Sequence, residues 1–293
     1  MKDFSFWKEY EGNSEGSGRS EKIWLINPDT NQIGLFKFKK DRDTTDHVSE
    51  CLAYQLAQLL EIPCAKFELG QYWGREGSMS YNIIQTPDEI LIEGINFINY
   101  IYPQYDAEKF IDIESGDKYS IEMLQKVLSK FIDFNEFLKI PLFDYLIGNT
   151  DRHQSNWAIL WDGKKQRFSP LYDNSSSLCA YLPENQIEAF MGKDMLRWKS
   201  LVETKSKSLI RRTIDDLKRP THVEMLQYIR DNYYEATKSL VEKIILVITD
   251  ENIERILDLY KENELSSRKK IIIKKYLNSK VEKMKEIYFG EEE

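Results

Sequence analysis

Alternating hydrophobic and polar positions along the first 85 residues predict a mainly β segment. Two apolar runs, residues 23–26 and 34–39, flank a turn of Asn, Pro, Asp and Thr, which is typical of two strands joined by a turn. Two further short strands are expected at residues 65–70 and 79–84.

One helix interrupts this β segment. The pattern predicts a helix over residues 47–61, and Pro63 would end it. The residues before it are N-cap candidates, namely Thr44, Thr45 and Asp46.

From about residue 104 the spacing of apolar positions becomes helical. Helices are predicted over residues 121–131 and 135–147, and again through most of residues 224–289. A β-hairpin is expected between them, because an Asp-Gly turn joins the apolar runs 157–161 and 168–172. The sequence thus predicts an α+β fold of two lobes: a small β-rich lobe with one helix over residues 1–90, and a larger, mainly helical lobe over residues 91–293.

Composition fits a globular protein. Of the 293 residues, 41% are hydrophobic, enough for a packed core. The net charge of −8 argues against direct binding to nucleic acid. Three scattered cysteines fit a reducing compartment and do not suggest a disulfide framework or a zinc site.

No signal-peptide pattern begins the chain, and no window approaches the ~18 apolar residues of a membrane span. We therefore expect a cytoplasmic protein, or one exported by a system that reads no N-terminal signal. In residues 269–275, pairs of lysines flank three isoleucines; a basic membrane-surface helix is one interpretation, but a C-terminal helix with solvated lysines is preferred.

Three polar residues suggest phosphoryl transfer to a hydroxyl. Asp151 is followed by Asn156, and Asp173 comes after the predicted hairpin. Such a reaction needs a carboxylate that accepts the hydroxyl proton and hard oxygen ligands for Mg²⁺. Asp151 suits the first role, and Asn156 and Asp173 suit the second. Read alone, the short Asp151 motif is also compatible with a polar turn.

The hairpin favours the catalytic interpretation. Asn156 lies just before its first strand and Asp173 just after its second, so a tight turn places both at the open end. Asp151 lies in the loop that feeds this strand. The adjacent Arg152 or His153 is expected to stabilise the loop or to bind a phosphate.

Nucleotide-binding residues are expected in the small lobe. In the strand 34–39, Lys37 and Lys39 face one side, and Lys37 is preferred as the phosphate-binding lysine because it lies between two phenylalanines. Glu50, at the border of the apolar face of the predicted helix, is its natural partner. Solvated lysines on a strand are the simpler alternative.

A Gly/Ser-rich segment precedes the first strands, where a phosphate-covering loop would lie. It offers backbone N–H groups and hydroxyls, although a flexible linker has the same composition. It lacks the P-loop pattern, so a P-loop NTPase is not expected.

Together these motifs make the chain similar to the HipA-like serine/threonine kinases, especially the shorter, CtkA-like group without the extra N-terminal subdomain. The most specific segment is Asn149-Thr150-Asp151-Arg152-His153 through Asn156. The resemblance also covers the strand of Lys37, the helix of Glu50, and Pro170-Leu171-Tyr172-Asp173.

The resemblance implies a protein-kinase-like fold that uses ATP and Mg²⁺, with Asp151 as catalytic base and Asn156 and Asp173 as metal ligands. Lys37 takes the nucleotide position. The implied phosphate-loop residues are Ser17, Gly18, Arg19, Ser20 and Lys22. Family members commonly autophosphorylate near this loop, which points to Ser14, Ser17 or Ser20. Some members are toxins with an antitoxin partner.

The chain also departs from related patterns. Ordinary protein kinases read His-Arg-Asp and Asp-Phe-Gly, whereas here Asp151 precedes Arg152-His153 and Asp173 precedes Asn174. Ser155 stands where HipA has a lysine. The leading hypothesis is a protein serine/threonine kinase of toxin or effector type. A lipid or small-molecule kinase is the main alternative, because phosphoinositide kinases carry a similar Asp-Arg-x-x-x-Asn loop. A non-catalytic binding module and a metal-dependent nuclease are weaker hypotheses.

Overall fold

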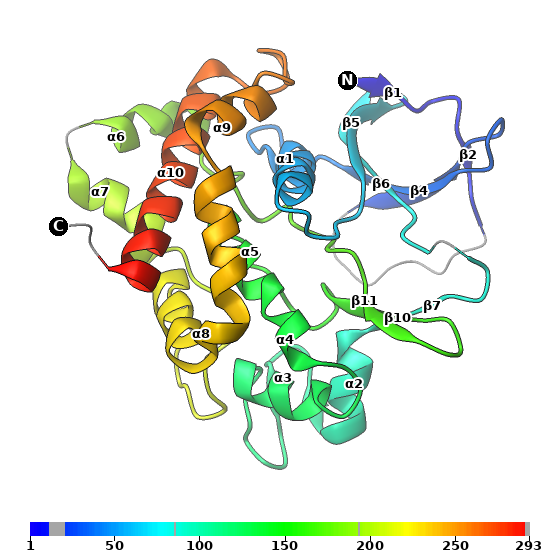
Figure 1. Cartoon of the computed structure of the whole chain (residues 1–293). Coiled ribbons are helices and arrows are strands. Elements are labelled where there is room, and N and C mark those ends of the chain that lie inside the picture. Colours follow the sequence, from blue (N-terminus) through cyan, green and yellow to red (C-terminus); the bar gives the residue numbers. More distant parts are fainter. Residues whose placement is uncertain (12–20, 85, 193, 291–293) are drawn as a thin grey trace.

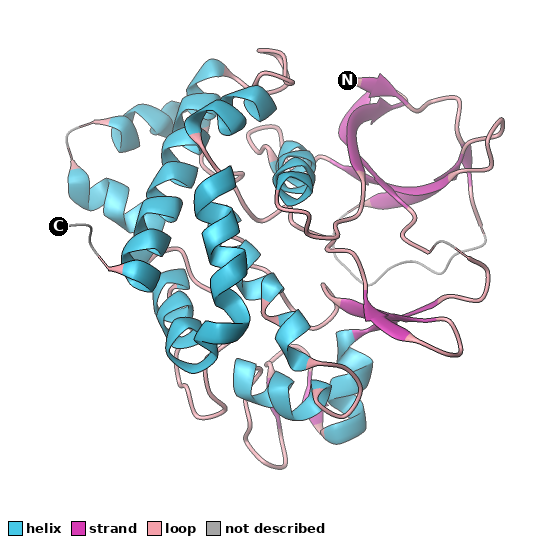
Figure 2. Ribbon diagram, in the orientation of Figure 1, coloured by secondary structure: helices cyan, strands magenta, loops and turns pink. Residues whose placement is uncertain are grey.

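The computed structural model describes residues 1–11, 21–84, 86–192 and 194–290. A curled β-sheet and one helix form the smaller part, and the rest is mainly helical (Figure 1, Figure 2). The α+β fold class expected from the sequence is confirmed.

The smaller part is built on a six-stranded sheet in the order β1-β5-β6-β4-β3-β2. Its strands are β1 (Lys2–Asp3), β2 (Lys8–Glu9), β3 (Lys22–Ile26), β4 (Ile33–Phe38), β5 (Phe67–Tyr72) and β6 (Arg75–Tyr81). β1 runs parallel to β5, and all other pairs are antiparallel. The two edge strands were not predicted, because two residues are too few to show a period.

Alternation along β4 separates the two faces of this sheet. Phe36 and Phe38 point into a mostly aromatic cluster that includes Phe4, Trp7 and Tyr72. Lys37 lies between them in sequence and therefore on the other face. The expected strand is confirmed, and it turns its lysine away from the aromatic core.

Helix α1 (Asp46–Leu59) covers the lysine-bearing side of the sheet (Figure 1). Thr45 is the N-cap residue, but its hydroxyl makes no capping hydrogen bond; the Asp46 carboxylate accepts from the Thr44 hydroxyl and from the Lys40 backbone instead. Apolar residues of α1 belong to the large core that fills the helical part. This helix therefore joins the sheet to the rest of the molecule.

The predicted hairpin is present and gains a third strand. β10 (Ala158–Trp161) pairs with β11 (Gln166–Phe168) on one side and with β7 (Ile90–Glu93) on the other. β7 thus pairs with a strand of the larger part. The lobe boundary at residue 90 stays a prediction.

The larger part is formed mainly by helices, of which α5, α8 and α10 pack together (Figure 1). Its elements are α2 (Gly94–Ile101), the ribbon β8 (Tyr105–Asp106) and β9 (Ile111–Asp112), α3 (Ile121–Leu128), α4 (Phe134–Phe137), α5 (Lys139–Ile147), a 3-10 helix (Glu184–Gln186), α6 (Ile187–Met191), α7 (Met195–Lys199), a π-helical turn (Ser200–Thr204), α8 (His222–Val247), α9 (Asp250–Leu257) and α10 (Ser267–Phe289). Thr221 and Glu224 form a capping box that begins α8.

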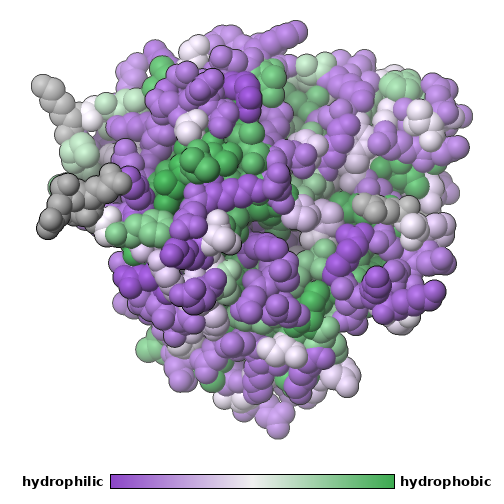
Figure 3. Space-filling view, in the orientation of Figure 1, coloured by the Kyte–Doolittle hydropathy of each residue, from purple (hydrophilic) through white to green (hydrophobic). Residues whose placement is uncertain are grey.

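The lysines of α10 differ from expectation. Lys269 is 2% exposed, and its ammonium donates to the backbone oxygens of Cys179 and Leu182 at 2.9 and 2.6 Å. The prediction of solvated lysines is therefore wrong at this position, because the chain after Asp173 offers carbonyl acceptors there. Within the described ranges no helix combines the length and hydropathy of a membrane span. The face shown in Figure 3 is mainly hydrophilic, with its largest hydrophobic area over the helices.

Candidate active site

Asp151 lies in a loop that begins where α5 ends. Gly148 closes this helix in the left-handed conformation with φ of 69°, and an added Cβ would lie 2.0 Å from the Tyr276 hydroxyl. Asn149 then anchors the loop, since its Nδ2 donates to Asp144 Oδ1 and its Oδ1 accepts from the Asp151 backbone N–H. The Asp151 side chain itself is exposed.

Arg152 is the buried centre of this loop, with 1% of its surface exposed. Its Nε and Nη2 donate to the Asp144 carboxylate, and Nη2 also donates to Asn174 Oδ1 at 2.7 Å. Nη1 donates to the backbone oxygens of Asn156 and Tyr172, both at 2.8 Å. One nitrogen therefore holds together the chain at Asn156 and at Tyr172, the residue before Asp173.

Asn156 is oriented by its own amide. Nδ2 donates to the backbone oxygen of Asp151 at 2.7 Å. A carbonyl can only accept, so the other end of the amide is the oxygen, and Oδ1 is left for a cation. Because Arg152 Nη1 bridges the backbone oxygens of Asn156 and Tyr172, Asn156 and Asp173 lie at one end of the hairpin, as expected from the sequence.

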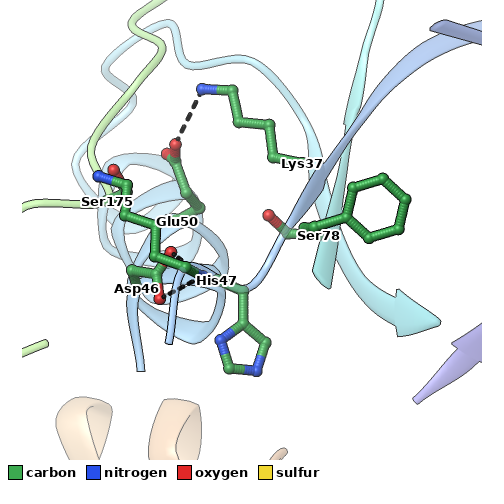
Figure 4. A pocket seen from close by; sticks show the side chains of 8 residues that line it. Lys37, Asp46, His47, Glu50, Ser78 and Ser175 are labelled. Atoms are coloured by element: carbon green, nitrogen blue, oxygen red, sulfur yellow. Dashed lines mark hydrogen bonds and ion pairs between the residues drawn. The ribbon is translucent and has the colours of Figure 1, made fainter. Parts of the chain in front are cut away.

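Lys37 connects the sheet to this end of the hairpin. Its ammonium lies 3.3 Å from Glu50 Oε1 and 3.2 Å from Asp173 Oδ1. Figure 4 shows Lys37 reaching from β4 toward Glu50 on α1. The second oxygen of Glu50 accepts from the Asn174 backbone N–H at 2.8 Å. The ion pair between Lys37 and Glu50 expected from the sequence is present, and Asp173 shares the lysine.

Burial and charge act against each other in this group. Burial disfavours the charged forms, but Asp173 and Glu50 together raise the pKa of Lys37. Burial also opposes ionisation of Asp173, yet Lys37, Arg152 and His153 outweigh it and lower its pKa to about 2. For Glu50 burial dominates, and its pKa is raised. Asp173 is thus an anion at neutral pH.

Asp151 has a different environment. Although Asp151 is exposed to solvent on one side, the protein around its carboxyl removes part of the surrounding water and so raises the carboxyl's pKa, and the nearby charge of Asp173 acts in the same direction. His153, Lys40 and Arg219 oppose the shift. A carboxyl with a raised pKa is a better proton acceptor than an ordinary aspartate, as general-base catalysis requires.

Asn156 and Asp173 suit Mg²⁺ with help from a ligand. Among the described residues no group of three or more His, Cys, Asp or Glu side chains could hold a metal ion. Mg²⁺ is commonly held by one or two protein oxygens while phosphates and water complete its shell. One amide oxygen and one carboxylate therefore fit a metal that arrives with a nucleotide.

The remaining predicted site residues fall into two groups. Lys22 pairs with Lys37 across β3 and β4, so both side chains lie on one face. His153 accepts a hydrogen bond from the Ser155 backbone at its Nδ1, which makes it a loop-stabilising residue. The other predicted loop residues, Ser14, Ser17, Gly18, Arg19 and Ser20, lie outside the described residues.

Sequence analysis missed several residues that hold the site. Asp144 and Asn174 bind Arg152, and Arg219 donates to the Thr150 backbone oxygen at 2.9 Å. Asp144 left a signal, because an aspartate among the apolar residues of a buried helix needs a charged partner. Arg219 left none, since its partner is a backbone atom far away in sequence.

A buried polar chain also reaches the loop from α10. Lys280 donates to Val202 O and Ser206 Oγ, and Ser206 contacts His222 Nδ1 at 2.8 Å. His222 Nε2 lies 2.9 Å from the Asn149 backbone oxygen and must donate to it. Burial lowers the pKa of His222 to about 3, so the ring is neutral and Nδ1 accepts from Ser206.

The curled sheet, helix α1 and the mainly helical part together form a kinase-like fold. The model for the HipA-like C-terminal domain matches residues 14–230, and the chain therefore belongs to this family. The resemblance inferred from the sequence is confirmed. A comparison with curated proteins gave no match.

Two solved structures share the fold. The crystal structure of the Helicobacter pylori proinflammatory kinase CtkA is 18% identical, with a TM-score of 0.80 over 98% of this chain and 97% of its own. A chain in the Shewanella oneidensis MR-1 complex of HipA, HipB and operator DNA is 12% identical, with a TM-score of 0.59 over 97% of this chain and 67% of its own.

Replacing Arg152 by Met should destabilise the protein strongly. The change leaves the buried Asp144 carboxylate without its partner, which costs about 3–5 kcal/mol of unfolding free energy. Urea unfolding of Arg152→Met measures this loss. Arg167→Met is the matched control, because Arg167 pairs with Glu89 at the surface and its loss should cost no more than about 1 kcal/mol. Equal costs for the two variants would contradict the central role of Arg152.

Lys280 should make the free energy of unfolding depend on pH between about 7 and 10.5. Burial lowers its pKa from 10.5 to about 7, so between these values the unfolded chain holds a proton that the folded chain lacks. The free energy of unfolding should therefore rise with pH across this window. The difference between wild type and Lys280→Met, measured by urea unfolding from pH 6 to 10, should show this slope; a flat difference would refute the shift.

Proposed function

We propose that the chain is an ATP- and Mg²⁺-dependent protein serine/threonine kinase. The observation that carries this proposal is the position of Lys37, held by Glu50 and Asp173 beside the loop of Asp151 and Asn156. In protein kinases a lysine–glutamate pair and a metal-binding aspartate must both be in place for transfer. Membership of the HipA-like family supports the same conclusion.

Each side chain has a distinct task in the proposed reaction. The acceptor oxygen bonds to the γ-phosphorus as the bond to the ADP oxygen breaks, and Asp151 takes the hydroxyl proton. Lys37 holds nucleotide phosphates, and Glu50 fixes the direction of Lys37. Asn156 Oδ1 and Asp173 hold the metal, which neutralises phosphate charge when bound. Arg152 has no phosphate to bind, because its N–H groups are used inside the protein.

The proposed acceptor is a protein hydroxyl, including serines of the chain itself. Ser14, Ser17 and Ser20 are the proposed autophosphorylation sites because they fall in the segment that family resemblance assigns to the phosphate loop. A lipid acceptor is the competing possibility, since the Asp151-to-Asn156 spacing is shared with lipid kinases. The proposal includes toxin- or effector-type action and a restraining partner protein, as the names of CtkA and of the HipA–HipB complex suggest.

Transfer of labelled phosphate from ATP to the chain should depend on Asp151 and Lys37. Asp151→Asn removes the proton acceptor and should lower the rate by ~10² or more, and Lys37→Met should act similarly through nucleotide binding. Lys39→Met is the matched control, because Lys39 directly follows the same strand but pairs with the partly exposed Glu76. Robust phosphorylation by Asp151→Asn would refute its assigned role.

Expression of the wild-type chain should arrest bacterial growth if it acts as a toxin-type kinase. Asp173→Asn should relieve the arrest, because it removes the charged metal ligand while keeping the size of the side chain. Growth curves at matched protein levels, verified by immunoblot, measure the effect. Equal growth arrest by the wild type and by Asp173→Asn would show that the arrest does not require phosphoryl transfer and would contradict the proposed toxin-type kinase.

A further inference from the structure

Two arginines approach the catalytic loop from the segment between the π-helical turn and α8. Arg219 donates from Nη2 to the Thr150 backbone oxygen and from Nε to the Ser208 backbone oxygen, at 2.9 and 3.1 Å. Thr150 immediately precedes Asp151, so the guanidinium of Arg219 lies beside the proposed proton acceptor. These two contacts leave further N–H groups of Arg219 for a ligand.

Arg211 lies within electrostatic range of Arg219. Burial lowers the pKa of the Arg219 guanidinium; the Asp151 carboxylate opposes this shift, and the positive charge of Arg211 adds to it. The Arg211 backbone pairs with Tyr119, whose hydroxyl donates to the Arg152 backbone oxygen at 3.3 Å. The backbone of Arg211 is thereby tied, through Tyr119, to the catalytic loop.

Neither guanidinium has an ion-pair partner within the described ranges. No carboxylate there pairs with Arg211 or Arg219, and Asp216 pairs with Arg212 instead. Arg211 Nε is buried and meets no protein acceptor in these ranges, and the same is true of the hydroxyl of Tyr105, which is 9% exposed. Arg211 also acts electrostatically on this tyrosine. Two cations within electrostatic range of each other, together with two buried donors that meet no acceptor in the described ranges, are suited to bind an anion.

The position of this site selects the kind of anion. An acceptor hydroxyl must reach Asp151, and a residue one or two positions away along an acceptor chain lies within about 7 Å of it. Both arginines belong to the helical part, and Arg219 contacts Thr150, the residue before Asp151, whereas the proposed nucleotide-binding Lys37 belongs to the sheet. We propose, on the basis of the proposed function, that Arg211 and Arg219 select protein acceptors with an acidic side chain within two residues of the phosphorylated hydroxyl.

The sequence of the chain agrees with this preference. Ser14 and Ser20, two of the proposed autophosphorylation sites, are each followed directly by a glutamate. The whole chain is acidic, with a net charge of −8. Two arginines without an ion-pair partner in the described residues are therefore a locally positive feature near the catalytic loop.

Serine peptide libraries test the inference. Each library fixes Glu or Gln at one position from two before to two after a single serine, and kcat/KM is measured with the full chain and Mg²⁺-ATP. Wild type should prefer Glu over Gln by roughly ten-fold at one position or more. Arg211→Gln should bring this ratio close to one. Arg211→Lys, which keeps the charge, should retain part of the preference, and Arg212→Gln should keep all of it because Arg212 already has a carboxylate partner.

The possible outcomes separate this inference from the proposed function. Thermal unfolding verifies that Arg211→Gln is folded, and a ratio of rates does not depend on how much of it is active. Equal use of Glu and Gln peptides by wild type, or a preference that survives Arg211→Gln, would overturn the acidic-acceptor inference alone. Transfer to vesicles containing phosphatidylinositol 4-phosphate but to no peptide would overturn both the protein acceptor and the inference. No transfer to any acceptor despite Mg²⁺-ATP binding would overturn the kinase itself.

Discussion

The candidate site depends on one buried guanidinium. Arg152 meets a carboxylate from α5, a side-chain oxygen of Asn174, and two backbone oxygens, one in the catalytic loop and one at Tyr172, the residue before Asp173. A planar fork with five donors is the side chain that can join so many acceptors at fixed angles, and a lysine could not replace it. The separation of Asp151, Asn156 and Asp173 is therefore set by a residue that takes no part in the proposed chemistry.

A second constraint lies in the chain that follows Asp173. Asp173, Leu178 and Cys179 all have positive φ, which is unfavourable for residues other than glycine. Contacts from two directions hold these turns: α1 supplies the Ser49 hydroxyl to Ser177 O, and α10 supplies Lys269 to Cys179 O. Lys40 donates to the Tyr181 hydroxyl of the same segment. Elements of both parts of the molecule thus share the task of keeping Asp173 in place.

The sequence predicted those features that repeat locally. Alternation around Phe36 and Phe38 revealed β4, and the Asp-Gly turn revealed the hairpin that brings Asn156 toward Asp173. The pairing of Lys37 with Glu50 could be suggested because the strand and the helix each showed which side is apolar. What could not be predicted depends on contacts between distant segments, such as Arg219 with Thr150 or Lys269 with Cys179. Backbone carbonyls accept these bonds, and a carbonyl leaves no trace in the residue sequence.

The lysine that Glu50 and Asp173 share implies an exchange of partners. In the proposed function, nucleotide phosphates would bind Lys37, and the Asp173 carboxylate, released from the ammonium, would be available to hold the metal. Either ligand would then break the ion pair between Lys37 and Asp173, so the second ligand would no longer have to break it. Thermodynamic linkage requires that each ligand raises the affinity for the other by the same factor. The ion pair between Lys37 and Asp173 would in this way couple the two binding events, so that the affinity for the nucleotide depends on whether the metal is bound.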